Sequence, residues 1–296
     1  MNLFFHQGAL GDFVLALPIV RALAAAPGSE PITVVAAWSK GQLAQRLVPP
    51  VRSIDIELFE FSRLHAPDGP NCLHPAITPL FEGAQRIISF VSDGTDAWAT
   101  NMTRLATRAS MIFCTTRPEP GFSGHVWHWL KKQLGDQGLD LTEVPFKARQ
   151  PVQGPLLVHL GSGSTNKCWS ISRFEVLLNR LSAAGRNPLP VIGEAEVERW
   201  PQQRLEHWVR RYNTALPRTL DQLCDLLESA SGYIGNDAGP THLAAQMAVP
   251  TVAMFGPTDP AQWAPRGPHV RVVAPPTPRS MEWLDEQQVW DAVLTM

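Results

Sequence analysis

Short apolar runs alternate with amphipathic stretches along the first half of the chain. Such runs predict buried strands, and apolar residues recurring every three to four positions predict helices. The predicted strands cover residues 2–6, 32–38, 54–59, 86–90 and 110–114. The predicted helices cover residues 40–47, 73–82, 97–106 and 122–134, and another follows the first strand, with Phe13, Leu17, Val20 and Leu23 on one face and Pro18 either starting or kinking it. This alternation indicates a parallel sheet covered on both faces.

A proline-rich stretch, residues 145–155, then interrupts the pattern and predicts an interdomain linker. The alternation restarts after it, with strands at 156–160, 188–193, from 233, 251–255 and 269–273, and helices at 171–184, 196–212, 220–229 and 281–296. We therefore expect an α/β protein of two Rossmann-like domains that face a central cleft. The expected boundaries are 1–148, 149–280, and a last helix, 281–296, that can pack back on the first domain.

The charge balance narrows the classes of partner. With 25 basic and 27 acidic side chains, no overall field favours nucleic acid or an anionic membrane, so an anionic ligand must be held by local groups. The four cysteines are scattered without a CxxC pair or metal spacing, which is typical of reduced thiols in the cytoplasm. We expect no nucleic-acid partner and no bound metal.

The sequence shows neither a secretory signal nor a membrane-spanning segment. The first residues lack the basic segment of a signal peptide, and no apolar run approaches the ~18–20 residues of a membrane span. We expect a cytoplasmic protein and leave peripheral contact with the inner membrane open. Trp98, Trp127 and Trp129 cluster in the first half, where they either stack on sugar rings or, more simply, pack in the core.

Residues 233–245 read as a buried strand, a tight turn and the start of a helix. Gly239 is the expected N-cap, and Pro240 suits the first helical position. The free N–H groups and the dipole of such a helix start bind an anion, most naturally a phosphate, and His242 lies about one turn in. The alternative is that these residues only build a strand-to-helix turn.

A hydroxyl-rich loop, residues 161–169, follows the first strand of the second half. A Walker A motif needs glycine before its lysine and Ser or Thr after it, whereas Asn166 and Cys168 flank Lys167. What remains is a loop whose Lys167 neutralises a phosphate as a point charge, or an ordinary surface loop. Because this loop and the 237–242 turn both follow strands, we expect them to hold a diphosphate together at one edge of the sheet.

Residues 8–12 run Gly-Ala-Leu-Gly-Asp, which is not the GxGxxG dinucleotide fingerprint. Trp38 and Ser39 stand where a ribose-binding acid would end the second strand, so a nicotinamide cofactor is disfavoured. Asp12 is either a helix N-cap or, if the cleft places it opposite the diphosphate, a general base.

Two further groups of polar residues follow strands in the second half. One of Glu194, Glu196 and Glu198 is a candidate for a hydrogen bond to a ribose, whereas solvated acids at a helix start explain the others. Thr258 and Asp259 are placed to close the ligand site from below, although turn chemistry alone accounts for both.

Four motifs together resemble the family-9 glycosyltransferases, whose best-known members are the ADP-heptose:lipopolysaccharide heptosyltransferases. They are Gly11-Asp12 with Pro18 close by, Lys167-x-Trp169, Asn236-Asp237-x-Gly239-Pro240-x-His242-Leu243-Ala244-Ala245, and Phe255-Gly256-Pro257-Thr258. The motifs occur in the right order across both halves, and the block from 236 to 258 is the most specific of them.

The resemblance implies a GT-B fold, with the acceptor on the N-terminal domain and the nucleotide-sugar donor on the C-terminal one. It implies an inverting reaction without a required metal. By matching position, Asp12 is similar to the family's general base, Lys167 to its phosphate-binding lysine, and the 237–242 turn to its diphosphate cradle. Two positions depart from the family: Ala238 replaces a usual threonine, and Cys168 replaces a basic or polar residue. Both bear on the identity of the donor.

We therefore expect an inverting, metal-independent glycosyltransferase that needs no cofactor and moves a heptose from ADP-heptose to a saccharide such as lipopolysaccharide core. The expected donor-binding residues are Ser162, Ser164, Thr165, Lys167, Glu196, Asp237, Ala238, Gly239, Thr241 and His242. The basic residues singled out for an anionic acceptor are Arg63, Arg104, Arg117 and His125. Two alternatives stay open: a sugar-nucleotide binding protein without transferase activity, and a nucleotide-sugar epimerase or hydrolase.

Overall fold

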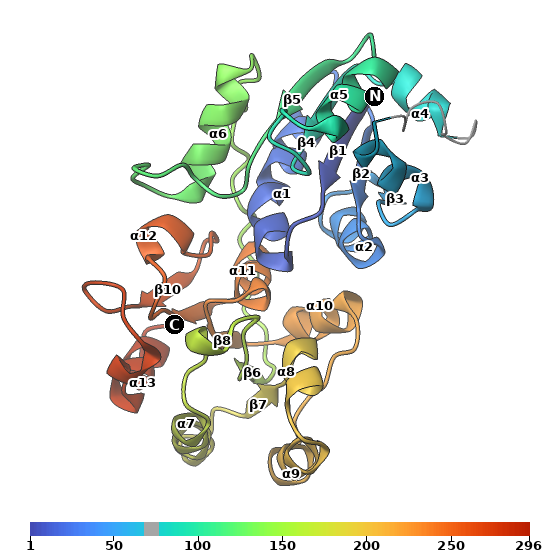
Figure 1. Ribbon diagram of the computed structural model, residues 1–296. Helices are drawn as coiled ribbons and strands as arrows, with labels where there is room; N and C mark the ends of the chain where they lie inside the picture. Colours follow the sequence, from blue (N-terminus) through green and yellow to red (C-terminus); the bar gives the residue numbers. More distant parts are fainter. Residues whose placement is uncertain (68–76) are drawn as a thin grey trace. The chain divides into compact units, whose positions relative to one another are not determined.

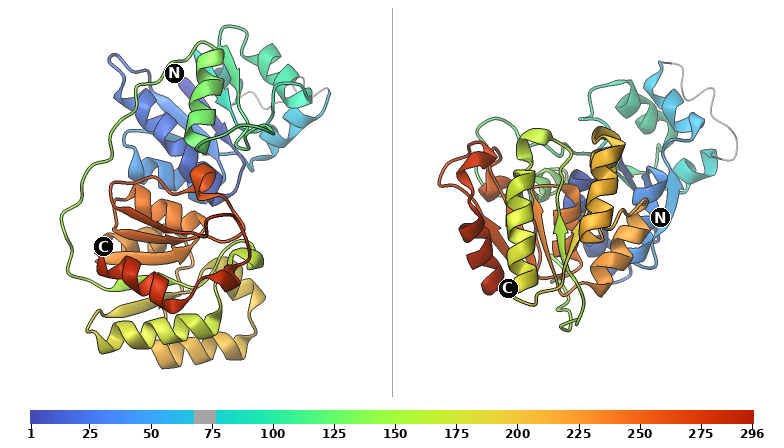
Figure 2. Two further views of the ribbon diagram at one scale, coloured as in Figure 1. Left: turned by 90° about the vertical axis from the view of Figure 1, so that its left-hand side faces the viewer. Right: turned by 90° about the horizontal axis from the view of Figure 1, so that it is seen from below.

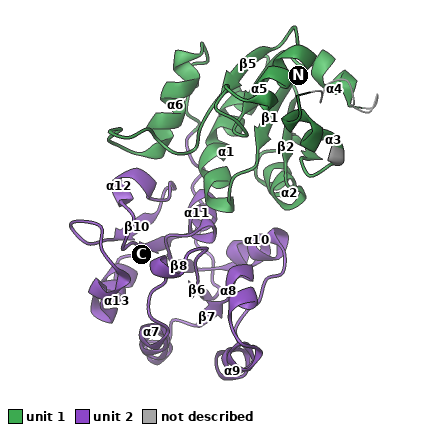
Figure 3. Ribbon diagram, in the orientation of Figure 1, with its two compact units in different colours: residues 1–144 green, residues 145–296 purple. Residues whose placement is uncertain are grey.

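The computed structural model describes residues 1–67 and 77–296, and the chain divides into two compact units, residues 1–144 and 145–296 (Figure 3). Each unit is built on one five-stranded parallel sheet (Figure 1). No helix among the described residues is long and apolar enough to cross a membrane.

The sheet of the first unit has the strand order β3-β2-β1-β4-β5. The strands are β1 (Asn2–His6), β2 (Ile32–Ala36), β3 (Arg52–Asp55), β4 (Arg86–Ser89) and β5 (Ser110–Phe113). The strand predicted over 54–59 is wrong in its second half, because the chain leaves the sheet after Asp55 and turns into a short helix. The strand order reverses between β1 and β4, which makes the carboxyl end of β1 a switch point where ligands bind in sheets of this type.

Helices cover both faces of this sheet. One face carries α1 (Leu10–Ala25), α2 (Trp38–Leu47) and α6 (Val126–Asp136). The other carries α3 (Phe59–Ser62), the 3-10 turn η1 (Arg63–His65), α4 (Thr78–Glu82) and α5 (Ala97–Leu105). The predicted helix 73–82 lies partly outside the described residues, which resume just before α4.

Helix α1 is buried almost all round rather than on one face. Every residue from Phe13 to Val20 is buried, because the sheet lies on one side and α2 and α6 pack on the others. Pro18 lies inside the helix and does not start it. The three tryptophans considered for sugar stacking, Trp98, Trp127 and Trp129, are at most 7% exposed and belong to the core.

The sheet of the second unit has the order β10-β9-β8-β6-β7. Its strands are β6 (Leu156–His159), β7 (Pro188–Val191), β8 (Gly232–Asn236), β9 (Thr251–Met254) and β10 (Val270–Val273). Successive strands run outward from β6 to β7 on one side and from β8 to β10 on the other, so the switch point lies between β6 and β8. The two loops expected to hold a diphosphate follow these two strands.

One face of this sheet packs under α7 (Ile171–Ala183), α9 (Gln202–Tyr212) and α13 (Glu286–Leu294), which share one core. The remaining helical segments of the unit are η3 (Thr165–Lys167), α8 (Glu194–Arg199), α10 (Leu220–Ser229), α11 (Gly239–Gln246), α12 (Pro260–Trp263) and η4 (Met281–Trp283). The single helix predicted over 196–212 is two helices, because Pro201 stands between α8 and α9.

The C-terminal helix packs within the second unit. Figure 2 shows α13 beside α7, and α13 also contacts β9 and β10. Its inward residues, Val289, Ala292 and Val293, join the core of that unit. The apolar face of α13 is thus covered by the core of the second unit, and the expected return of this helix to the first domain stays a prediction. The helix is also shorter than the predicted 281–296, since a 3-10 turn and an Asp285 capping box precede it.

The proline-rich stretch 145–155 forms no helix or strand, and it is anchored to the second unit. The guanidinium of Arg149 donates to the carbonyl oxygens of Leu227 (2.7 Å) and Ala230 (3.1 Å), and also to that of Glu228. These carbonyls are at the C-terminal end of α10, where helical acceptors lack partners.

Candidate functional site

The strand-to-helix turns after β6 and β8 bring most of the predicted donor-binding residues together. The two strands are direct neighbours, and their carboxyl ends meet at the switch point of the second sheet. Loop 161–169 leaves β6 and the 237–242 turn leaves β8, so polar side chains separated by about 70 positions come into contact. The prediction that these two elements share one edge is consistent with this geometry.

Asp237 is the centre of the arrangement. Its Oδ2 accepts from Lys167 Nζ at 2.7 Å and from Thr258 Oγ1 at 2.7 Å, and its Oδ1 lies 3.5 Å from His242 Nε2. Burial raises the pKa of this carboxyl, but the hydrogen bonds from His242, Lys167 and Thr258 and the charge of Lys167 outweigh that effect and lower the pKa to about 2. Asp237 is therefore an anion that fixes Lys167 in place.

Asn236, one residue earlier, fastens the loop and the turn to each other. Its Oδ1 accepts from Trp169 N at 2.9 Å, and its Nδ2 donates to Leu160 O and Gly161 O at 3.2 and 3.1 Å. Its carbonyl oxygen accepts from Thr241 Oγ1 at 2.5 Å. Asn236 is fully buried, so both ends of loop 161–169 are held from within the protein.

Two details of the predicted helix start are corrected. The N-cap of α11 is Ala238 in extended conformation, and Gly239 is already the first helical residue. The hydroxyl of Thr241 is fully buried and donates to Asn236 O. It therefore stabilises the turn and is not placed to bind a ligand. The N–H groups of Thr241 and His242 both donate to Ala238 O. Because Pro240 has no N–H, Ala238 and Gly239 supply the N–H groups that can bind an anion at this helix start.

His242 is 5% exposed and shares one ring nitrogen with Asp237, while its Nδ1 has no hydrogen-bond partner among the described residues. Within the described ranges, His6 Nε2 and His159 Nδ1 are buried without a partner in the same way, so the contact that distinguishes His242 is the one with Asp237.

Glu196 is the acid that turns inward, whereas Glu194 and Glu198 are exposed. Its Oε1 accepts from Ser162 N at 3.2 Å and pairs with Arg199 Nη2 at 2.5 Å. Burial raises the pKa of Glu196 above its usual value, and the opposing effects of Arg199 and the Ser162 N–H are smaller. The carboxylate sits against Gly161, where an added Cβ would lie 1.8 Å from its carboxyl carbon, so only glycine leaves room for it.

The hydroxyls of the loop divide into inward and outward groups. Ser162 is buried and donates to Asp237 O at 3.0 Å. Ser164 and Thr165 are exposed, and Ser164 donates to Asn166 Oδ1 at 2.6 Å. Burial raises the pKa of the Cys168 thiol, so the residue stays a neutral thiol between Lys167 and Trp169.

Asp12 lies at the switch point of the first sheet, in the first turn of α1, and is half-buried. The N-cap of α1 is Ala9, so the interpretation of Asp12 as a plain N-cap is wrong. An acid in the first turn still interacts favourably with the helix dipole. Beneath the turn, His6 is fully buried and accepts from Gly8 N at 3.1 Å. Burial and the nearby Lys40 lower the pKa of His6 to about 3, so His6 is neutral.

The four basic residues proposed for an acceptor do not form one group. Arg63 lies in η1 beyond the carboxyl end of β3, and Arg117 and His125 lie in the segment after β5. His125 Nδ1 accepts from Trp127 N at 3.0 Å as the N-cap of α6, which supports a structural role. Arg104 is in the last turn of α5, where the chain returns to the start of β5, and thus lies toward the opposite edge of the sheet.

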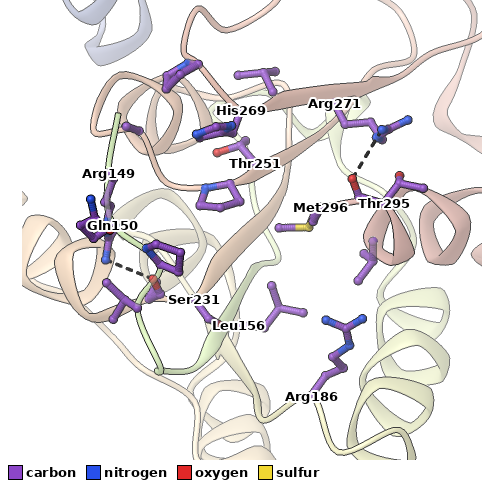
Figure 4. Close-up of a pocket in the computed structure, with 18 residues that line it drawn as sticks. Arg149, Gln150, Leu156, Arg186, Ser231, Thr251, His269, Arg271, Thr295 and Met296 are labelled. Carbon is purple, nitrogen blue, oxygen red and sulfur yellow. Dashed lines mark hydrogen bonds between the residues drawn. The ribbon is translucent and has the colours of Figure 1, made fainter. Parts of the chain in front are cut away.

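A cavity of about 560 Å³ opens at the amino ends of β6, β9 and β10, opposite the candidate site of the second unit (Figure 4). Arg149, Arg186, His269 and Arg271 line it together with Leu156 and Met296. Arg186, His269 and Arg271 are exposed, whereas Arg149 is half-buried and donates to backbone carbonyls. We assign no chemistry to it. No group of three or more His, Cys, Asp and Glu side chains among the described residues is placed to hold a metal ion.

Sequence reasoning overlooked two side chains that shape these sites. Arg199 is one helical turn after Glu196 and pairs with it, and this i,i+3 spacing was the available signal. Lys40, at the start of α2, donates to Gly8 O at 2.6 Å, a contact 32 positions apart that only the pairing of β1 with β2 brings about.

A family model described as glycosyltransferase family 9 (heptosyltransferase) matches residues 131–290. Lipopolysaccharide heptosyltransferase 1 of Pseudomonas aeruginosa is 34% identical over 134 residues, which cover 44% of this chain and 36% of that protein. Lipooligosaccharide heptosyltransferase 2 of Campylobacter jejuni is 30% identical over 136 residues, or 42% of each chain. The matched part is thus less than half of either relative.

Solved structures resemble the chain over nearly its whole length. An E. coli heptosyltransferase solved with ADP has a TM-score of 0.72 at 17% identity, with 99% of both chains covered. A family-9 glycosyl transferase of Veillonella parvula has a TM-score of 0.71 at 16% identity, with 99% of this chain and 96% of that chain covered. At these identities the likeness concerns the fold.

Proposed function

The chain belongs to glycosyltransferase family 9, whose model covers more than half of it, and from this premise we propose that it transfers a sugar from a nucleotide diphosphate donor to a saccharide acceptor. Its two parallel-sheet units have the GT-B fold. The observation that carries the proposal is the ion pair of Lys167 with the buried, ionised Asp237 beside the start of α11.

The second unit is the proposed donor side. The Lys167 side chain is 30% exposed, and its ammonium is held by Asp237. The ammonium therefore has a fixed position from which it can contact a ligand. We assign the diphosphate to Lys167 and to the N–H groups of Ala238 and Gly239, and His242 supports this site through its contact with Asp237. Glu196, the inward acid, is the proposed ribose contact.

The first unit is the proposed acceptor side, with Asp12 as the general base. Asp12 takes the proton from the acceptor hydroxyl while that oxygen forms a bond to the anomeric carbon and the bond to the nucleotide diphosphate breaks, so the anomeric configuration inverts. Lys167 and the helix start stabilise the negative charge that develops on the leaving group, a task that other enzymes give to a divalent ion.

ADP-heptose is the proposed donor, and lipopolysaccharide core is the proposed acceptor, on the strength of the heptosyltransferase relatives. We place the reaction in the cytoplasm, at the inner membrane where a lipid-linked acceptor would lie. Arg63 and Arg117 are the acceptor contacts that we retain, because both follow carboxyl ends of strands in the first unit.

Calorimetric titration with ADP, UDP, GDP and dTDP, each in EDTA, tests the donor side. We expect one diphosphate to bind, and Lys167→Ala to weaken that binding at least tenfold, because a charge-assisted contact to phosphate is lost. Lys147→Ala, which changes an exposed lysine of the linker, is the matched control. Failure of all four nucleotides to bind would leave only a resemblance of fold.

Sugar transfer from ADP-heptose to heptose-free lipopolysaccharide tests the base. Asp12→Asn should reduce turnover by about 10²–10⁴-fold and leave donor affinity near normal, because a general base acts on the acceptor only. Asp140→Asn, at an exposed position of the same unit, is the control. Undiminished turnover by Asp12→Asn would remove Asp12 from the mechanism, and nucleotide binding without transfer would favour a binding protein.

A further inference from the structure

Lys40 is a half-buried lysine at the carboxyl edge of the first sheet. It stands in the first turn of α2, two residues after exposed Trp38, and its ammonium donates to the carbonyl oxygen of Gly8 at 2.6 Å. Burial lowers the pKa of Lys40, while the carboxylates of Glu57 and Asp12 raise it. A lysine loses solvation when it is held in this way, so the contact needs a compensating interaction.

Gly8 lies between the Lys40 contact and Asp12. A methyl group at Gly8 would lie 3.4 Å from Asp12 Oδ2, 3.3 Å from Asp12 Cβ and 2.8 Å from His6 Cε1, so the Asp12 carboxylate folds back over this glycine. The Gly8 N–H is bound by His6 and the Gly8 carbonyl by Lys40. Both polar groups of the residue on which Asp12 rests are thereby fixed.

We propose that Lys40 is a positioning residue, which fixes the turn before α1 and supplies the positive charge that keeps the Asp12 carboxylate ionised for base catalysis. The inference rests on the proposed role of Asp12. A base works only when it is unprotonated, and a nearby ammonium favours the unprotonated carboxylate. In this proposal Lys40 acts through the turn on which Asp12 rests and not on a substrate.

Other ionisable groups around α1 are the alternatives to Lys40 as sources of positive charge near Asp12. His6 on β1 is neutral, and Glu57 after β3 is an acid and cannot supply positive charge. Helices α2 and α6 and α1 itself also carry Arg46, His128, Lys131, Lys132, Asp136 and Arg21. Lys40 is the residue whose contact with the backbone beneath Asp12 carries the proposal.

The test is the pH dependence of kcat/KM, which reports the ionisation of the free enzyme. Lys40→Met removes the charge and the hydrogen bond, Lys40→Gln keeps a donor for Gly8 O without the charge, and Lys40→Arg keeps both. We expect the acid limb to move up by about one pH unit in Lys40→Met and Lys40→Gln and to stay in place in Lys40→Arg. The affinity for the nucleotide diphosphate should not change, and Ser39→Ala, an exposed neighbour, is the control.

An acid limb that stays in place in Lys40→Gln, with activity lowered equally at every pH, would overturn the inference and leave Lys40 a structural residue. Lys40→Gln is the decisive variant if Lys40→Met unfolds, because its amide can replace the hydrogen bond to Gly8. Asp12→Asn separates the two levels of the argument. If Asp12→Asn transfers sugar as fast as the wild type, the proposed role of Asp12 as the base fails; if it is inactive and Lys40→Gln titrates like the wild type, only the role of Lys40 fails.

Discussion

Asp237 shows how one buried carboxylate serves a site that binds negative charge. Three segments that follow different strands or start a helix contribute its partners, namely Lys167, Thr258 and His242. A carboxylate this close to a diphosphate repels it, so its value lies in holding the lysine. Both members of a buried pair are costly alone, and removal of one leaves the other uncompensated.

Asp237→Asn should lower the free energy of unfolding by about 2 kcal/mol at pH 7. The folded pKa of about 2 lies below the ordinary 3.8, so the stabilisation is present in full above pH 4. It is lost as the pH falls from about 4 toward 2, where the folded protein also takes up the proton.

Urea denaturation of the wild type and of Asp237→Asn at several pH values between 7 and 3.5 measures this difference. Asp225→Asn, at an exposed position on α10, should stay within about 0.5 kcal/mol of the wild type. A difference between wild type and Asp237→Asn that grows on acidification would contradict the ionised state of Asp237.

At the scale of elements, the conformation of the loop after β6 depends on the close contact between its first residue, Gly161, and helix α8. Gly161 leaves the space that Glu196 fills, and Glu196 in turn accepts from Ser162 N and pairs with Arg199. The carboxyl group is the far end of a flexible side chain, so a larger residue at 161 would push it aside rather than prevent folding.

Gly161→Ala should therefore cost only about 1–2 kcal/mol of stability and yet weaken nucleotide binding as much as Glu196→Gln does. The double variant should bind no more weakly than either single variant, because both remove the same contact. Calorimetry with the preferred diphosphate gives the three affinities. Additive losses would mean that Gly161 and Glu196 act on the nucleotide separately.

Strands were the elements best predicted from the sequence. Buried parallel strands such as β1 and β9 are short apolar runs, and nearly all were found within a few residues. Helix α1 was also predicted, but with one apolar face, whereas the helix is buried almost all round and Pro18 lies inside it rather than at its start. The strand assigned to 54–59 failed because its apolar residues continue into a helix that covers the sheet.

The candidate site was only partly predictable. Residues that follow strands, such as Lys167 and Asp237, are found from their position, since parallel strands end at one edge. Which polar groups are already occupied is a tertiary property. The hydroxyl of Thr241 faces inward, and Lys40 reaches Gly8 across the sheet, and neither fact leaves a mark in the local sequence.

At the scale of the whole molecule, each unit buries one neutral histidine at the carboxyl end of the strand before its switch-point loop. His6 ends β1 and His159 ends β6. Burial, together with Lys40 in the first case, lowers the pKa of His6 to about 3, and burial lowers that of His159 to about 4 against a bond to the Gly161 backbone. Both units thus carry a group that resists protonation.

Mild acid should therefore destabilise both units. Below pH 6.5 the unfolded chain binds a proton at each histidine and the folded chain does not, so each unit should lose about 1.4 kcal/mol per pH unit down to about pH 4. Chemical denaturation at pH 7, 6 and 5, followed by tryptophan fluorescence, measures the slope. His159→Gln should remove the slope from the second unit and leave that of the first, which serves as an internal control.

The hydrogen bonds that hold the 236–242 turn have a consequence for how this stretch of sequence is retained in evolution. Asn236 and Thr241 hold the loops with bonds that need no sugar donor, so selection for a folded second domain alone would retain them. A descendant that had lost its base would still carry the same signature. Such a signature records ancestry, and the ion pairs of Lys167 and Glu196 would be retained for the same reason, so Asp12 is the position at which a lineage that has abandoned sugar transfer would first drift.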